Sequence, residues 1–186
     1  MSDAPARLLR GELVRLTALQ PDDTGVMAGW QGDAQFLRFY DAEPAFPKTA
    51  QQLTSYVAEQ QRSNTAFLFA IRPVDGDDLL GMVELDGILW NQGTGWVSIA
   101  IGDAAQRGQG FGAEAMRLLL DFAFDELNLR RVQLTVFRYN PTAIRLYEKL
   151  GFVQEGVFRE FLQRNGQVHD MLLYGLLRRE WEGNRE

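Results

Sequence analysis

The chain of 186 residues has no cysteine and one histidine, His169. The missing cysteines exclude disulfides, thiolate metal sites and a cysteine nucleophile, and one histidine leaves no histidine-rich metal cluster. No apolar run approaches the ~20 residues of a membrane span. The first residues, MSDAP, lack the basic segment and apolar core of a signal peptide. We therefore expect a cytoplasmic protein that binds neither a metal nor a membrane.

Basic residues are outnumbered, with 19 Lys and Arg against 25 Asp and Glu and a net charge of −6. This balance argues weakly against a nucleic-acid partner and is compatible with a cationic substrate, although such a charge also simply keeps a protein in solution. The apolar content of 46% is ordinary for a globular protein, and the length suits one domain. We place that single domain at residues 8–182.

The first half of the chain predicts four strands and two helices. Alternating apolar and polar residues from Glu12 to Leu19 indicate the first strand. Helix-start signals lie at Pro21, with a helix to about Trp30, and at Thr49. The aromatic stretch 32–48 has no clean period and indicates a loop or a broken helix. Three further strands, antiparallel to one another, are predicted at 66–71, 79–89 and 96–101.

The second half predicts two helices, at 114–127 and 142–150, and three strands, at 131–137, 152–162 and 168–177. The helix over 114–127 has an apolar stripe and crosses over to a strand that is parallel to the strand at 96–101. The last two strands form a hairpin. We therefore predict an α+β fold with a central mixed, mostly antiparallel sheet of six to seven strands, flanked by about four helices.

Three glycines fall at alternate positions in Arg107-Gly108-Gln109-Gly110-Phe111-Gly112, directly before the predicted helix. Glycine leaves backbone N–H groups accessible at a helix N-terminus, where partial positive charge gathers. Such a loop suits an anion, most often a phosphate. Taken alone, a glycine-rich turn could also serve only close packing.

Two common phosphate motifs do not fit this loop. A P-loop needs a lysine followed by serine or threonine, which are missing here. The dinucleotide fingerprint is formally present at Gly108, Gly110 and Ala113. It needs an acidic residue ~20 positions later, but the next strand ends in Phe137-Arg138-Tyr139-Asn140, without a carboxylate. The third candidate ligand is the pyrophosphate of coenzyme A.

This third candidate is supported by a resemblance to a family. Arg107-x-x-Gly110-x-Gly112 resembles the Q/R-x-x-G-x-G/A signature of the GNAT superfamily of N-acetyltransferases. One helix and one strand later, Asn140-Pro141-x-Ala143-x-x-Leu146-Tyr147-x-x-x-Gly151-Phe152 resembles the second motif of that family. The first strand and the last hairpin resemble its branch of ribosomal-protein and polyamine acetyltransferases. The two motifs in this order make the resemblance specific.

The resemblance implies an acetyl-CoA-dependent N-acetyltransferase whose sheet is splayed at the cofactor strand. The amides of the glycine loop would hold the pyrophosphate, and the strand before the loop would pair with the pantetheine arm and polarise the thioester carbonyl. Asn140 and the helix after it would also contact the cofactor. The predicted cofactor-binding residues are Ile99, Ala100, Ile101, Arg107, Gly108, Gln109, Gly110, Phe111, Gly112, Asn140, Ala143 and Tyr147.

Tyr147 is, by the same resemblance, the general acid that protonates the departing thiolate. It lies seven residues after Asn140, about two helical turns, so the two residues share a face. A phenol with a pKa near ~10 is protonated at neutral pH and can serve this role. The alternative is that Tyr147 only packs.

The general base is sought among acidic residues near the cofactor strand. Glu84 and Asp86 alternate on one face of the strand 79–89, and Glu84 is the first candidate, acting directly or through water. A solvated strand face is the alternative. Relatives often have a glutamate where this chain has Trp96, which removes one expected acid. His169 has a suitable ordinary pKa but belongs to the last hairpin.

The acceptor implied by the resemblance is a primary amine, on a small molecule or at a protein N-terminus, acetylated by direct transfer in a ternary complex. Aromatic and acidic residues before Lys48 could line its pocket, or the aromatics could be core. The alternative function is a non-catalytic acyl-CoA-binding regulator, against which Asn140 and Tyr147 argue. A homodimer is possible because the C-terminal strands have edges to cover. The candidate residues for the pocket of the amine acceptor are Trp30, Phe36, Phe39, Tyr40, Asp41, Glu43 and Phe46.

Overall fold

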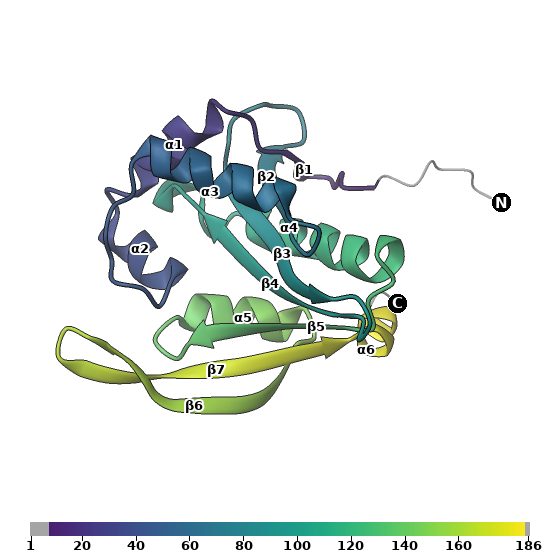
Figure 1. Ribbon diagram of the computed structural model, residues 1–186. Coiled ribbons are helices and arrows are strands. Elements are labelled where there is room, and N and C mark those ends of the chain that lie inside the picture. Colours follow the sequence, from purple (N-terminus) through teal and green to yellow (C-terminus); the bar gives the residue numbers. More distant parts are fainter. Residues whose placement is uncertain (1–7, 185–186) are drawn as a thin grey trace.

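The computed structural model describes residues 8–184 and has a seven-stranded sheet at its centre (Figure 1). The strand order is β1-β2-β3-β4-β5-β7-β6. All neighbouring strands are antiparallel except β4 and β5, which are parallel. The predicted mixed, mostly antiparallel sheet is therefore confirmed. The strands are β1 (Val14–Ala18), β2 (Phe67–Pro73), β3 (Gly81–Leu89), β4 (Thr94–Ile101), β5 (Arg131–Phe137), β6 (Val153–Arg164) and β7 (Gln167–Leu177).

Six α-helices flank the sheet in the described part of the chain, two more than the four expected. One of the two, α2, lies inside the stretch predicted as a loop or broken helix, and α6 follows the last strand. A 3-10 turn, η1 (Ala104–Gln106), precedes the glycine loop, and a π-helical turn, η2 (Phe122–Glu126), continues α4. The α-helices are α1 (Asp23–Trp30), α2 (Ala34–Tyr40), α3 (Ala50–Arg62), α4 (Phe111–Asp121), α5 (Pro141–Lys149) and α6 (Arg178–Asn184).

Each face of the sheet has its own apolar core. Helices α1, α2 and α3 pack on one face, where Trp30, Leu53 and Met82 belong to one buried cluster. Helices α4, α5 and α6 pack on the other face in a larger cluster that includes Met116 and Leu134. Because side chains alternate along a strand, neighbouring residues of β3 and β4 point to opposite cores.

The sheet opens between its two parallel strands, as the family resemblance predicted. The pairing of β4 with β5 covers Thr94–Trp96 against Arg131–Gln133 and stops there. Beyond these residues the two strands diverge (Figure 1). The glycine loop follows the end of β4 and α5 follows the end of β5, so both lie at the open side of the splay.

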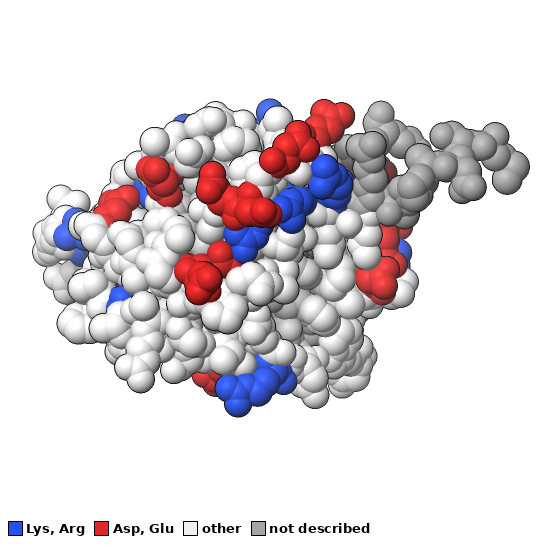
Figure 2. Space-filling view, turned by 90° about the horizontal axis from the view of Figure 1, so that it is seen from above, with Lys and Arg blue, Asp and Glu red and all other residues white. Residues whose placement is uncertain are grey.

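Charged side chains of both signs are mixed on the face of the molecule seen in Figure 2. Acidic side chains gather in a band there, and basic side chains lie within and beside it. No helix in the described range 8–184 is long and apolar enough to cross a membrane.

Candidate functional site

The splay exposes one backbone edge of β4. The N–H of Gly102 bonds to the carbonyl of Leu80 at 3.0 Å, on the β3 side. Backbone groups of alternate residues point to opposite neighbours, so those of Ile99 and Ile101 point toward β5. The carbonyl of Ala100 lies on the β3 side, against Gly81. Of the three predicted strand residues, Ile99 and Ile101 therefore face the gap with their backbone groups, and Ala100 does not.

The glycine loop forms a turn that only glycine adopts easily. Gly108 and Gly110 have φ angles of 78° and 90°, and Gly110 is the N-cap of α4. The helix begins at Phe111, three residues before the predicted start, so the N–H groups of Phe111 and Gly112 lie in its first turn, where no intrahelical acceptor exists. Gly108, Gln109 and Gly110 are exposed. The loop therefore presents backbone donors at a helix N-terminus, as a phosphate requires.

Arg107 is already engaged by protein groups. Its N–H donates to Ala104 at 3.2 Å. Its guanidinium donates to the carbonyls of Ile101 and Gly102 at 3.2 and 2.8 Å and forms an ion pair with Asp33 at 3.1 Å. Since Asp33 also caps α2, Arg107 joins the end of β4 to that helix.

Asn140 precedes α5 as its N-cap, and Tyr147 lies within the helix, seven residues later. The Oδ1 atom of Asn140 accepts the N–H of Ala143 at 3.2 Å and caps the helix. Tyr147 is buried, with its ring centre 5.8 Å from that of Phe152. Between residues 8 and 184 its hydroxyl has no hydrogen-bond partner. Burial raises the pKa of Tyr147 to about 12, so the phenol stays protonated at neutral pH.

Glu84 is a buried carboxyl on β3, beside β4, the strand predicted to bind the cofactor. It is paired across the β3–β4 ladder with Ser98 and faces the core under α3. Its Oε2 atom accepts the hydroxyl of Tyr56 at 2.9 Å, and its buried Oε1 atom has no partner among the described residues. Burial raises the pKa of Glu84 to about 7, against the opposing effect of the Tyr56 hydrogen bond. Glu84 is therefore not part of a solvated strand face.

The other two acid–base candidates, Asp86 and His169, lie on different strands, with Asp86 near Glu84 on β3 and His169 on β7. Asp86 is half-buried, opposite Trp96 on β4, and burial raises its pKa. His169 lies on β7 and packs edge-on against Tyr139, with ring centres 4.8 Å apart. Within residues 8–184, no group of three or more acidic or histidine side chains is placed to hold a metal ion.

A cavity of about 130 Å³ opens between α1, α2, α3 and the segment that follows α2. Tyr40, Asp41, Glu43 and Phe46 line it, together with Tyr56, which the sequence analysis did not propose as a functional residue. The predicted aromatic set is thus divided. Trp30 and Phe36 are core, and Phe39 stacks on Tyr139 with ring centres 5.7 Å apart, while Tyr40 and Phe46 reach the cavity.

Arg164, the last residue of β6 before the turn of the last hairpin, holds the acidic segment Asp41–Glu43 in place. Its Nη2 atom donates to three successive carbonyls, those of Asp41, Ala42 and Glu43, at 2.9, 3.1 and 2.8 Å. No local pattern marked this arginine, because its partners lie more than 120 residues away. Tyr56 was missed for a similar reason, since its helical spacing beside Leu53 and Val57 predicts only a packed face.

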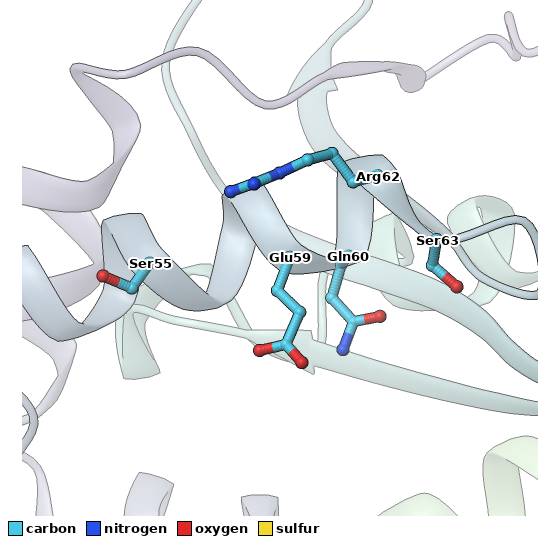
Figure 3. Close-up of a pocket in the computed structure, with 5 residues that line it drawn as sticks. All are labelled: Ser55, Glu59, Gln60, Arg62 and Ser63. Atoms are coloured by element: carbon cyan, nitrogen blue, oxygen red, sulfur yellow. The ribbon is translucent and has the colours of Figure 1, made fainter.

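A larger hollow of about 570 Å³ lies along the end of α3 (Figure 3). Its lining residues all come from α3 and the residue that ends it, and their side chains do not converge on a common point in Figure 3. It lies outside the splay. We therefore place the candidate site at the splay and the adjoining smaller cavity. The residues that line the larger hollow, outside this site, are Ser55, Glu59, Gln60, Arg62 and Ser63.

Known proteins resemble the chain over nearly its whole length. The family model for the acetyltransferase (GNAT) domain matches residues 14–153. The SPbeta prophage-derived uncharacterized N-acetyltransferase YokL of Bacillus subtilis is 32% identical over 94% of this chain and 95% of its own. The spermidine N(1)-acetyltransferase of Vibrio cholerae is 28% identical over 84% and 88%. A crystal structure of spermidine N-acetyltransferase from Vibrio cholerae, in complex with CoA and spermine, superposes with a TM-score of 0.83 at 25% identity, over 92% and 99%.

Proposed function

Because the chain belongs to the GNAT family of acetyltransferases and is an acyltransferase of that class, we propose that it transfers the acetyl group of acetyl-CoA directly to a primary amine. The observation that carries this proposal is the splay between β4 and β5, with a glycine loop at the end of β4. A strand with a free backbone edge is followed there by a helix N-terminus with free amides. The strand edge suits the amide-rich pantetheine arm of coenzyme A, and the helix N-terminus suits its pyrophosphate.

The residues present fit acetyl-CoA as the donor. The loop amides from Gly108 to Gly112 would hold the pyrophosphate, and the backbone of Ile99 would pair with the pantetheine arm. The carboxamide nitrogen of Asn140 is not needed for the helix cap, which uses its oxygen, and can donate to the cofactor. Arg107 acts by positioning the loop against β4, because its guanidinium is bound to Asp33 and to strand carbonyls.

The chemistry needs a neutral amine, a polarised carbonyl and a protonated thiolate. In our proposal Glu84 accepts the proton of the acceptor ammonium, since its pKa of about 7 makes it a base at neutral pH. The N–H of Ile99 polarises the thioester carbonyl. Tyr147 gives its proton to the sulfur as the C–S bond breaks, and no cysteine is present for an acyl-enzyme.

For the acceptor we propose a small cationic amine, with a protein N-terminus as the second class to test. The cavity beside the cofactor strand combines carboxylates from Asp41 and Glu43 with the rings of Tyr40 and Phe46. Carboxylates and aromatic faces both attract an ammonium group. Relatives that act on spermidine are consistent with this choice.

The test is an assay of free CoA released from acetyl-CoA over a panel of polyamines, monoamines and peptides. We expect release with at least one cationic amine, and about a hundredfold or greater fall in kcat for Tyr147→Phe with little change in the KM for acetyl-CoA. The phenylalanine keeps the buried ring, so the variant should stay folded. Full activity of Tyr147→Phe would show that this tyrosine only packs, and no release with any amine would contradict the proposed function.

A further inference from the structure

The hydroxyl of Tyr56 stands between the acceptor cavity and Glu84. Tyr56 lines the cavity, whereas Glu84 is not among the described residues that do so. The Tyr56 hydroxyl donates to Oε2 of Glu84 at 2.9 Å. An ammonium group in this cavity therefore meets the phenol before it meets the carboxylate.

The cavity also adjoins the strand at which the thioester is placed. Met82 lines the cavity, and on the sheet it is the direct partner of Ala100 on β4. Directly paired residues of antiparallel strands lie on the same face. Glu84 is paired with Ser98 on the same two strands, two residues from the Met82–Ala100 pair. The cavity and the Tyr56–Glu84 hydrogen bond therefore lie next to each other, and both lie beside β4, the proposed cofactor strand.

We propose that the Tyr56 hydroxyl relays the proton of the acceptor ammonium to Oε2 of Glu84. The inference rests on the proposed function. The phenol oxygen accepts a proton from the R–NH₃⁺ group as its own proton passes to the carboxylate. The step leaves R–NH₂, an unchanged tyrosine and a neutral glutamic acid, so that charge and protons balance.

The surroundings keep Tyr56 protonated between turnovers. Burial raises its pKa above the ordinary value, and the nearby Tyr40 and Glu84 add to the rise. Burial likewise raises the pKa of Tyr40, on α2, to about 12. Asp86 on β3 raises the pKa of Glu84 further. A phenol that resists ionisation passes protons without accumulating tyrosinate. The other titratable side chains at the cavity are those of Asp41, Glu43 and Lys48.

The test compares Tyr56→Phe with a matched control, Tyr174→Phe. Tyr174 donates to Glu148 at 3.0 Å, the same kind of tyrosine–glutamate bond on the opposite face of the sheet. For an alkylamine acceptor that is protonated at the assay pH, Tyr56→Phe should lower kcat by about a hundredfold with an unchanged KM for acetyl-CoA. Tyr174→Phe should leave kcat unchanged.

The decisive measurement uses a fluorinated analogue of the same amine, whose lowered pKa leaves it neutral at the assay pH. A neutral acceptor needs no proton removal before attack, so Tyr56→Phe should recover most of its activity with it, and so should Glu84→Gln. An equal loss with both amines would overturn the relay and leave Tyr56 a positioning residue. Full activity of Tyr56→Phe with the protonated amine would also overturn the relay. The wild-type chain is assayed with both amines as well. If it transfers acetyl groups, the proposed function stands, and a loss in a variant concerns only the relay.

Discussion

Glu84 and Tyr147 lie on opposite faces of the sheet, and burial raises the pKa of both. The effect on protonation at neutral pH differs because the ordinary pKa of a carboxyl, 4.5, lies far below that of a phenol, 10.0. A carboxyl raised to about 7 is divided between acid and base at neutral pH, whereas a phenol raised to about 12 remains an acid. In the proposed reaction, Glu84 on one face removes a proton from the amine and Tyr147 on the other supplies one to sulfur. The family resemblance suggested the role of Tyr147, and the place of Glu84 beside the predicted cofactor strand suggested its role as a base. The burial that sets the protonation of Glu84 depends on α3 and was not predicted.

The buried carboxyl of Glu84 makes the stability of the fold depend on pH. Its pKa is 4.5 in an ordinary setting and about 7 in the folded chain. Below 4.5 the group is neutral in both states and carries no penalty. As the pH rises from 4.5 to about 7, the carboxyl ionises in the unfolded state before it does in the folded state. The free energy of unfolding therefore falls across this window, by an amount on the order of 3 kcal/mol in total. Glu84→Gln removes the charge, so its free energy of unfolding should exceed that of the wild type increasingly between about pH 5 and pH 8.

Denaturant unfolding of both proteins at several pH values measures this difference. Subtracting the two curves cancels the contributions of groups that the substitution does not touch, and leaves that of Glu84. Parallel curves would mean that water reaches the carboxyl and that burial does not set its pKa.

Among the elements, those with a clear period were predictable and those held by tertiary contacts were not. The strand Arg131–Phe137 was predicted with its observed bounds because its β-branched run is bordered by turns. Helix α2 was not, since its aromatic residues follow no period. The hydrogen bond that the N–H of Gln35 donates to its N-cap Asp33, and its buried Phe36, become visible only in the structure. The Tyr56–Glu84 bond joins residues 28 positions apart and has no local signal.

The start of α4 allows the glycine loop to be tested with two neighbouring substitutions. Gly110 has a φ of 90°, and an added Cβ would lie 3.3 Å from a methyl group of Leu13. We expect Gly110→Ala to cost about 1–2 kcal/mol of stability and to raise the KM for acetyl-CoA. Gly112 has no such φ, and its Cβ would lie 3.6 Å from Ile99, an ordinary contact.

Gly112→Ala is therefore the steric control, expected to stay close to the wild type in thermal unfolding and in KM. Thermal unfolding with and without CoA separates the loss of fold stability from the loss of binding. Equal effects of the two substitutions would show that the left-handed turn at Gly110 does not shape the loop.

In the whole molecule, segments far apart in the sequence meet on the side of the splay where we propose that the acceptor binds. The hydroxyl of Tyr139, just after β5, donates to the carbonyl of Arg38 on α2 at 2.7 Å, and the side chain of Arg38 donates to Asn165 at 3.0 Å. Arg164 completes this attachment of the last hairpin to the acidic segment. Figure 1 shows α2 and the hairpin turn on the same, open side of the splay. The sequence predicted β5 and the turn of the last hairpin, but neither α2 as a regular helix nor the contacts among these segments.

The net charge of −6 and the acidic segment at the cavity predict how the enzyme responds to salt. Charges beyond the Debye length, about 10 Å at 0.1 M salt, are screened. Added salt should therefore lower kcat/KM more steeply for a diamine than for a monoamine of equal length, because the diamine presents two ammonium groups to Asp41 and Glu43. Neutralising both carboxylates, as Asp41→Asn with Glu43→Gln, should make the two slopes nearly equal. The backbone carbonyls that Arg164 holds are unchanged in that variant, so the segment keeps its anchor. Equal slopes for the two amines in the wild type would show that the acidic segment does not attract the acceptor.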